Sequence, residues 1–107
     1  MARLRGVLFE FSTPLGFHVR VTRERWELIT VVKHPVMLGR EDRVRLALEA
    51  PDEVWLSQKD KTVLLFYKKE APKRWICAVV KRSDTGAFLL TAYPSDAIKE
   101  GRRIWPT

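Results

Sequence analysis

Between Glu53 and Pro94 the chain reads EVWLSQKDKTVLLFYKKEAPKRWICAVVKRSDTGAFLLTAYP, and this stretch decides the fold. Apolar and polar residues alternate in much of it, which is the period of a half-buried β-strand. Three short breaks, KDK, EAPK and RSDTG, have good turn chemistry and separate four strand-like runs. Because such short links join neighbouring strands, we predict a four-stranded antiparallel sheet here. The runs are EVWLSQ (53–58), TVLLFYKK (62–69), RWICAVVK (74–81) and AFLLTAYP (87–94).

Two helix-like segments precede this region. Residues 21–35 include Thr22, a residue type that caps helix N-termini well, followed by apolar residues at helical spacing. The β-branched run ITVV (29–32) could equally form a strand. Pro35 disfavours helical geometry in the residue before it, so we expect this helix to end or break at His34. Residues 40–51 carry acidic residues at their start and an apolar stripe, which predicts a second helix.

The N-terminal region predicts a β-hairpin, because the apolar runs 5–11 and 16–21 flank the turn-like STPLG. The chain of 107 residues is long enough for one domain, which we place at 1–107. The element order predicts an α+β fold with an N-terminal β-hairpin, two helices and then the four-stranded antiparallel sheet. The helices should cover one face of that sheet, and the other face should stay partly open.

The charge balance favours an anionic partner. Twenty Lys and Arg residues against thirteen Asp and Glu residues give a net charge of +7, and nucleic acid is the commonest partner of such proteins. A basic surface that binds nothing is the alternative interpretation. No apolar run is long enough to cross a bilayer, and the single Cys77 cannot form an internal disulfide. We therefore expect a cytoplasmic protein without a membrane partner, in which Cys77 is a small buried residue.

Strand alternation should gather aromatic and polar side chains on the open face of the sheet. Such a face beside a basic rim is a credible ligand surface, although each residue taken singly could equally be a strand-edge residue without a role. The expected groupings are Tyr67 and Lys69 with Val63 and Leu65, Thr91 and Tyr93 with Leu89, and Ser57 with Trp55. Trp55 could stack a base from this face.

The residue types fit metal-free RNA cleavage better than other hydrolytic chemistry. His18, His34 and Cys77 lie far from any zinc-ligand spacing, and the predicted strands hold almost no acidic residues for magnesium. No glycine-rich phosphate loop or nucleophile-elbow motif occurs. RNA supplies its own nucleophile, the 2′-OH, so a protein needs only to move protons and stabilise charge. Histidine suits the proton steps, and Lys, Arg, Tyr, Ser and Thr suit the binding steps.

Several segments in their order and spacing extend this picture, namely KHPVM, APDEVWLSQKD, VLLFYKK, WICAVVK and FLLTAYPSDAIKEGRRIW. Over about residues 26–105 the chain resembles a phage- and mobile-element-associated branch of the barnase–EndoU–colicin–RelE group of ribonucleases. The resemblance implies helices ahead of a four-stranded antiparallel sheet, as in RelE and barnase. It also implies a toxin-like endoribonuclease that needs no metal or other cofactor, acts on RNA and can pair with an acidic antitoxin or immunity protein.

The resemblance also implies roles for individual residues, carried over by position. His34 would be the general acid or base, although a cation near a helix C-terminus is the alternative explanation for this residue. Thr91 and Tyr93 would contact the scissile phosphate or nucleotide, and Tyr67 and Ser57 would line the same face. Positive charge would come from Lys33, Lys69 and Lys99. Lys33 stands where the family pattern has arginine, so the two-pronged phosphate contact of arginine is lost.

Two other functions remain open at this point. The first is a nucleic-acid-binding module without catalysis, whose binding would weaken with salt because phosphate contacts release counterions. The second is a protein-interaction domain whose basic face binds an acidic partner.

Overall fold

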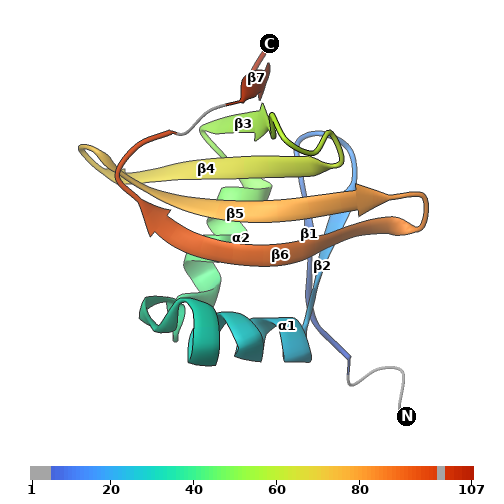
Figure 1. The fold of residues 1–107 in the computed structure, drawn as a ribbon, viewed down its shortest axis with the longest axis vertical. Helices are drawn as coiled ribbons and strands as arrows, with labels where there is room; N and C mark the ends of the chain where they lie inside the picture. The colour runs from blue at the N-terminus through green and yellow to red at the C-terminus, as the bar shows by residue number, and fades with distance from the viewer. Residues whose placement is uncertain (1–5, 99–100) are drawn as a thin grey trace.

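The computed structural model describes residues 6–98 and 101–107, and these residues build one sheet with helices against it (Figure 1). Within this part of the chain, seven strands hydrogen-bond in the order β1-β2-β6-β5-β4-β3-β7. The strands are β1 (Val7–Ser12), β2 (His18–Thr22), β3 (Glu53–Leu56), β4 (Val63–Ala71), β5 (Arg74–Ser83), β6 (Gly86–Ser95) and β7 (Arg102–Trp105). The helical elements are α1 (Arg23–Glu27), the π-helix η2 (Leu28–Lys33), the 3-10 helix η3 (Pro35–Met37) and α2 (Glu41–Glu49).

The predicted fold class is wrong. We expected a four-stranded antiparallel sheet beside a separate hairpin, whereas the structure has one seven-stranded mixed sheet. β2 pairs in parallel with β6 through Val19 with Ala87 and Arg20 with Phe88, which joins the N-terminal hairpin to the main sheet. At the other edge β7 pairs antiparallel with β3. Neither of these two strand pairings can be predicted from local sequence signals, because each connects segments that are far apart in the chain.

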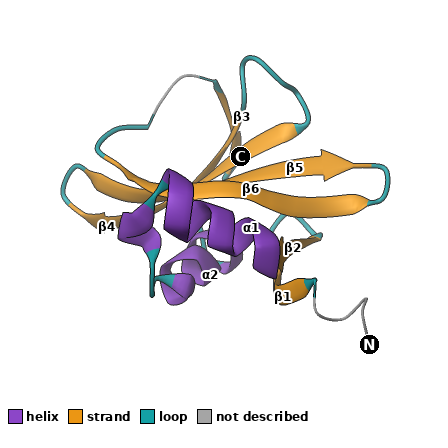
Figure 2. Cartoon of the chain, turned by 60° about the horizontal axis from the view of Figure 1, so that its bottom comes forward, coloured by secondary structure: helices purple, strands orange, loops and turns teal. Residues whose placement is uncertain are grey.

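The helices lie together on one side of the sheet (Figure 2), and the main core fills the space between them. Leu48 of α2, Phe66 of β4 and Ile76 of β5 are fully buried there. The core residues of β4 and β5 occupy alternate positions, Leu64 and Phe66 in β4 and Ile76, Ala78 and Val80 in β5, as the two-residue period of a β-strand requires. In the described part of the chain, no helix has the length and hydrophobicity that a bilayer crossing requires.

The first helix changes its geometry half-way along. Thr22 caps α1, since its Oγ1 accepts a hydrogen bond from the Arg25 N–H at 3.1 Å, as predicted. The chain then widens into η2, in which the His34 N–H donates to the carbonyl oxygen of Ile29, five residues earlier, at 2.6 Å. η2 ends at Lys33, so the predicted helix end at His34 is confirmed. The wider turn leaves Lys33 exposed, whereas His34 is half-buried.

A β-bulge in β6 decides which side chains face the helices. The pairing with β5 shifts between Val79 and Val80, so that Leu90 has no partner. Leu89 consequently points into the main core, where it is 1% exposed. Thr91 pairs with Val79 and lies on the opposite face. The expectation that Leu89 shares a side with Thr91 and Tyr93 is therefore wrong, because one extra residue reverses the alternation.

Candidate active site

The sheet face opposite the helices carries a second, smaller cluster, and we call this face the uncovered face. Three of its residues form a row across β4, β5 and β6: Tyr67 pairs with Cys77, and Cys77 pairs with Tyr93. Cys77 is the middle residue of this row, with one tyrosine on each side. Burial raises the pKa of this thiol to about 11, and the neighbouring Tyr93 and Tyr67 side chains only partly offset that effect. The thiol therefore keeps its proton at neutral pH. We call this row of three side chains the platform.

The two tyrosines of this row have different surroundings. Tyr67 is 0% exposed, so it lies on the predicted face but presents no surface to a ligand. Tyr93 is only half-buried and can contact a ligand. Burial raises the pKa of Tyr93, and the neighbouring Cys77 raises it further. The Tyr93 hydroxyl thus remains protonated, while the accessible part of its side chain can serve as a stacking surface.

His34 meets this platform at the edge of β6. The centroids of the His34 and Tyr93 rings are 5.3 Å apart, and the rings are tilted by 43°. The imidazole comes from the end of η2, and Pro35 starts the next helical turn behind it. His34 is half-buried rather than enclosed, so a ligand on Tyr93 can reach the ring. The other histidine, His18, lies on the N-terminal hairpin with its Nδ1 3.3 Å from Ser12 Oγ.

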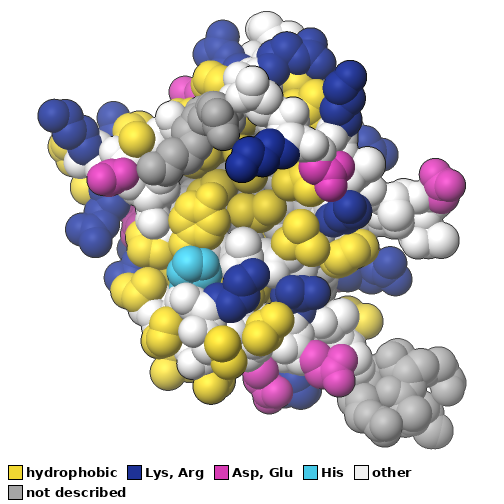
Figure 3. Space-filling view, in the orientation of Figure 1, with side chains coloured by type: hydrophobic (Ala, Val, Ile, Leu, Met, Phe, Trp, Pro, Cys, Tyr) yellow, Lys and Arg dark blue, Asp and Glu magenta, His cyan; other side chains and the backbone are white. Residues whose placement is uncertain are grey.

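Cations surround the uncovered face. Figure 3 shows an apolar area (yellow) with Lys and Arg side chains (dark blue) around it. Arg25 of α1 reaches β6, where its Nη1 donates to the Leu90 carbonyl oxygen at 3.4 Å. Lys33 directly precedes His34 in the chain, is exposed and forms no ion pair with the residues that the structure describes. Positive charge beside this part of β6 therefore comes from two elements, Arg25 of α1 at Leu90 and Lys33 next to His34 in the chain.

Thr91 lies two residues before Tyr93 on the same face, as predicted for this pair. Its Oγ1 is buried and has no hydrogen-bond partner among the described residues. An unpaired buried hydroxyl destabilises a fold, so its presence calls for a physical reason. Because the atom is buried, a phosphate on the surface does not reach it directly.

The remaining predicted site residues do not join His34. Trp55 lies on β3, with Leu65 and Val79 between it and Thr91 in the cross-strand row, and its Nε1 donates to Glu53 Oε1 at 2.8 Å. Lys69 is exposed one row further along the sheet, with its Nζ 5.7 Å from the centre of the Trp75 ring. Lys99 lies outside the described residues.

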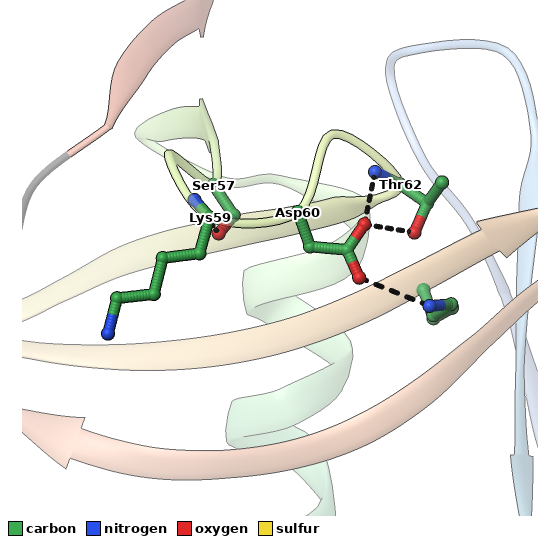
Figure 4. A network of polar contacts seen from close by, with 5 residues as sticks. Ser57, Lys59, Asp60 and Thr62 are labelled. Carbon is green, nitrogen blue, oxygen red and sulfur yellow. Dashed lines mark hydrogen bonds and ion pairs between the residues drawn. The ribbon is translucent and has the colours of Figure 1, made fainter.

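Ser57 belongs to the turn between β3 and β4 rather than to the site (Figure 4). Its Oγ accepts a hydrogen bond from the Lys59 N–H at 3.3 Å. In the same turn Asp60 accepts hydrogen bonds from the Thr62 hydroxyl at 2.6 Å and from Lys81 Nζ at 3.2 Å. The bonds from Thr62, followed by Lys81, lower the pKa of Asp60 to about 2. These contacts explain the polar residues of this turn without a ligand.

No family model, curated protein or solved structure matches this chain. The chemistry of the site therefore rests on its own side chains. Residues 6–98 and 101–107 contain no group of three or more His, Cys, Asp or Glu side chains that could hold a metal ion.

Sequence reasoning missed Arg25 as a member of the site. Its contact with β6 is made to a backbone oxygen 65 residues away, and no residue pattern encodes such a contact. The prediction that Cys77 is buried is confirmed, but its place between two tyrosines does not follow from the sequence. The strand periods place Tyr67 and Cys77 on their strands, and only the sheet register shows that they are neighbours.

Proposed function

We propose that this protein binds RNA on its uncovered face and cleaves it as a metal-independent endoribonuclease, with His34 as the catalytic residue. The observation that carries the proposal is the His34–Tyr93 pair, an accessible imidazole 5.3 Å from an aromatic platform. A titratable ring beside a stacking surface is what cleavage next to an unpaired base requires. The net charge of +7 adds attraction for a polyanion.

The geometry supports the following division of roles. A base or ribose stacks on the half-buried ring of Tyr93. His34 takes the proton of the 2′-OH while the 2′-oxygen forms a bond to phosphorus. The bond between phosphorus and the 5′-oxygen then breaks, and the leaving oxygen takes a proton from solvent. Arg25 and Lys33 offset the negative charge that accumulates on the phosphate oxygens.

The test is cleavage of unpaired RNA in the presence of EDTA. We expect products with 2′,3′-cyclic phosphate and 5′-hydroxyl ends. The His34→Gln variant should lose about 10²- to 10⁴-fold of the rate, which is the usual contribution of a positioned acid or base. His18→Gln is the matched control, because it removes the other imidazole from an exposed position on the N-terminal hairpin. Its rate should equal that of the unmodified protein. Intact RNA across a broad set of sequences, or full activity of folded His34→Gln protein, would refute the proposal.

The apolar area with its cationic surroundings favours one further candidate function, the binding of single-stranded nucleic acid without cleavage (Figure 3). In that case His34→Gln should leave affinity unchanged, and binding should weaken steeply as salt rises. Salt-sensitive binding of RNA that stays intact would favour this function over the nuclease.

A further inference from the structure

A pocket lies beside Tyr93, at the end of β6 that is nearest the β4–β5 turn. Its volume is about 670 Å³, and it is lined by residues 71–74 of the turn and by residues 93–96. We call it the β4–β5 pocket. Tyr93 belongs both to this pocket and to the ring pair with His34, so the two sites are continuous. None of its other lining residues has a role in the cleavage step.

The charged residues of the pocket are arranged for an anion. Lys73 and Arg74 are both exposed, and neither forms an ion pair with the residues that the structure describes. They belong to the turn that lines one side of the pocket, whereas Asp96 belongs to the segment at the end of β6 that lines the other. A phosphate entering the pocket would therefore be attracted to the turn and repelled from Asp96. Two half-buried lysines of the sheet, Lys68 and Lys81, have acidic partners instead, Asp52 and Asp60.

We propose that the β4–β5 pocket binds a second phosphate of the RNA, the one adjacent to the scissile phosphate in the chain. Lys73 and Arg74 would bind it. This inference rests on the proposed function, because it needs an RNA chain stacked on Tyr93. A chain that leaves Tyr93 along β6 enters the pocket at once, since Tyr93 forms part of its lining. The pocket thus extends the site from one phosphodiester to at least two consecutive phosphates.

The backbone of the turn permits a clean test. Lys73 has a φ of 57°, in the left-handed region that glycine adopts more readily than any other residue. Lys73→Gly therefore removes the charge without straining the turn, and Arg74→Gln removes the second charge. The double variant Lys59→Gln with Lys61→Gln is the matched control, because it makes the same change in net charge in the β3–β4 turn. Urea unfolding of both double variants verifies that each is folded.

The substrates are a dinucleotide and the same dinucleotide with one extra phosphate at either its 5′ or its 3′ end. Both Kd, with a non-cleavable 2′-deoxy version, and kcat/KM are measured. We expect one of the two extra phosphates to improve affinity at least about tenfold in the unmodified protein and in the control. The pocket variant should lose that gain, and its slope of log affinity against log salt should fall by about 0.7, as for one phosphate contact on a single strand.

The outcomes separate the two proposals. Loss of the phosphate gain in the pocket variant alone supports the inference, whether or not RNA is cleaved, because affinity is measured independently of cleavage. The inference is overturned if neither extra phosphate helps, or if the pocket variant and the control respond alike. In both of those cases normal cleavage by the unmodified protein would leave the proposed function standing. A protein that neither binds nor cleaves any of these substrates would end both.

Discussion

The two faces of the sheet use the same strands for different purposes. In β4, Phe66 points into the helix-covered core, whereas its neighbours Leu65 and Tyr67 lie on the uncovered face. The core is built almost wholly from aliphatic and aromatic side chains. The uncovered face instead combines apolar side chains with two phenols, a thiol and, at its edge, an imidazole. The comparison teaches that stability is concentrated on one face, which leaves the other free to carry polar groups.

The largest expected effect tests whether stability is concentrated on the helix-covered face of the sheet. Phe66→Ala should lower the free energy of unfolding by about 3–5 kcal/mol, because it leaves a cavity in a fully buried position. Leu65→Ala removes a half-buried side chain one residue away, on the uncovered face, and should lower the free energy of unfolding by clearly less. Urea unfolding followed by circular dichroism measures both values. Equal losses in the two variants would show that the two faces contribute alike.

The second prediction separates the two tyrosines of the uncovered face. Tyr93→Leu should weaken RNA binding by about 1–3 kcal/mol, the usual contribution of one stacked base. Tyr67→Phe should leave RNA affinity unchanged, because Tyr67 is fully buried, and should lower stability by about 1 kcal/mol. Fluorescence anisotropy with labelled RNA and urea unfolding give the two numbers. An affinity loss in Tyr67→Phe similar to that in Tyr93→Leu would contradict the assignment of the platform.

The third prediction concerns alkaline pH. The pKa of the Cys77 thiol is about 11 in the folded protein against an ordinary 9.0, so above pH 9 the unfolded chain releases this proton first. Stability from Cys77 is therefore complete below pH 9 and is lost as pH rises towards 11. Between pH 9 and 10 the loss should be about 1 kcal/mol. Cys77→Ser, which cannot titrate there, should lose correspondingly less in the same urea series. Identical pH profiles would show that the thiol does not titrate as described.

The smallest effect is expected at Thr91. Thr91→Val removes a buried hydroxyl that has no partner among the described residues, so stability should rise by up to about 1 kcal/mol. The rate of RNA cleavage should stay within a few-fold of that of the unmodified protein, because the hydroxyl is buried and does not reach a ligand on the surface. A loss of stability would mean that a bound water satisfies this oxygen. A large loss of cleavage would mean that Thr91 contacts the substrate after all.

The sequence predicts elements far better than their assembly. The periods of two and of about 3.6 residues locate the strands of 53–94 and the helix α2, and Thr22 and Pro35 mark the helix boundaries. The sheet as a whole is missed, because the parallel pairing of β2 with β6 and the pairing of β7 with β3 depend on non-local contacts. The bulge at Leu90 is missed as well, since nothing in FLLTAY indicates an extra residue.

The candidate site, like the fold, could be predicted only in part. His34 and Tyr93 do come together, because one ends a helix and the other lies on the strand beside it. Trp55, Ser57 and Lys69 share the face or its rim but lie too far across the sheet, and alternation alone cannot give that separation. The cations of the β4–β5 turn escape notice, because a turn sequence such as EAPK is explained equally well by solvent exposure.

The widened helix turn before His34 makes the position of the imidazole a matter of chain length rather than of residue type. η2 contains two exposed valines, Val31 at 71% and Val32 at 68%, so either one could be deleted with little loss of buried area. The shortened segment could close as an ordinary α-helix, in which the carbonyl of Ile29 bonds four residues ahead. A single in-frame codon deletion would then remove the wide turn beneath the imidazole without changing any residue of the sheet.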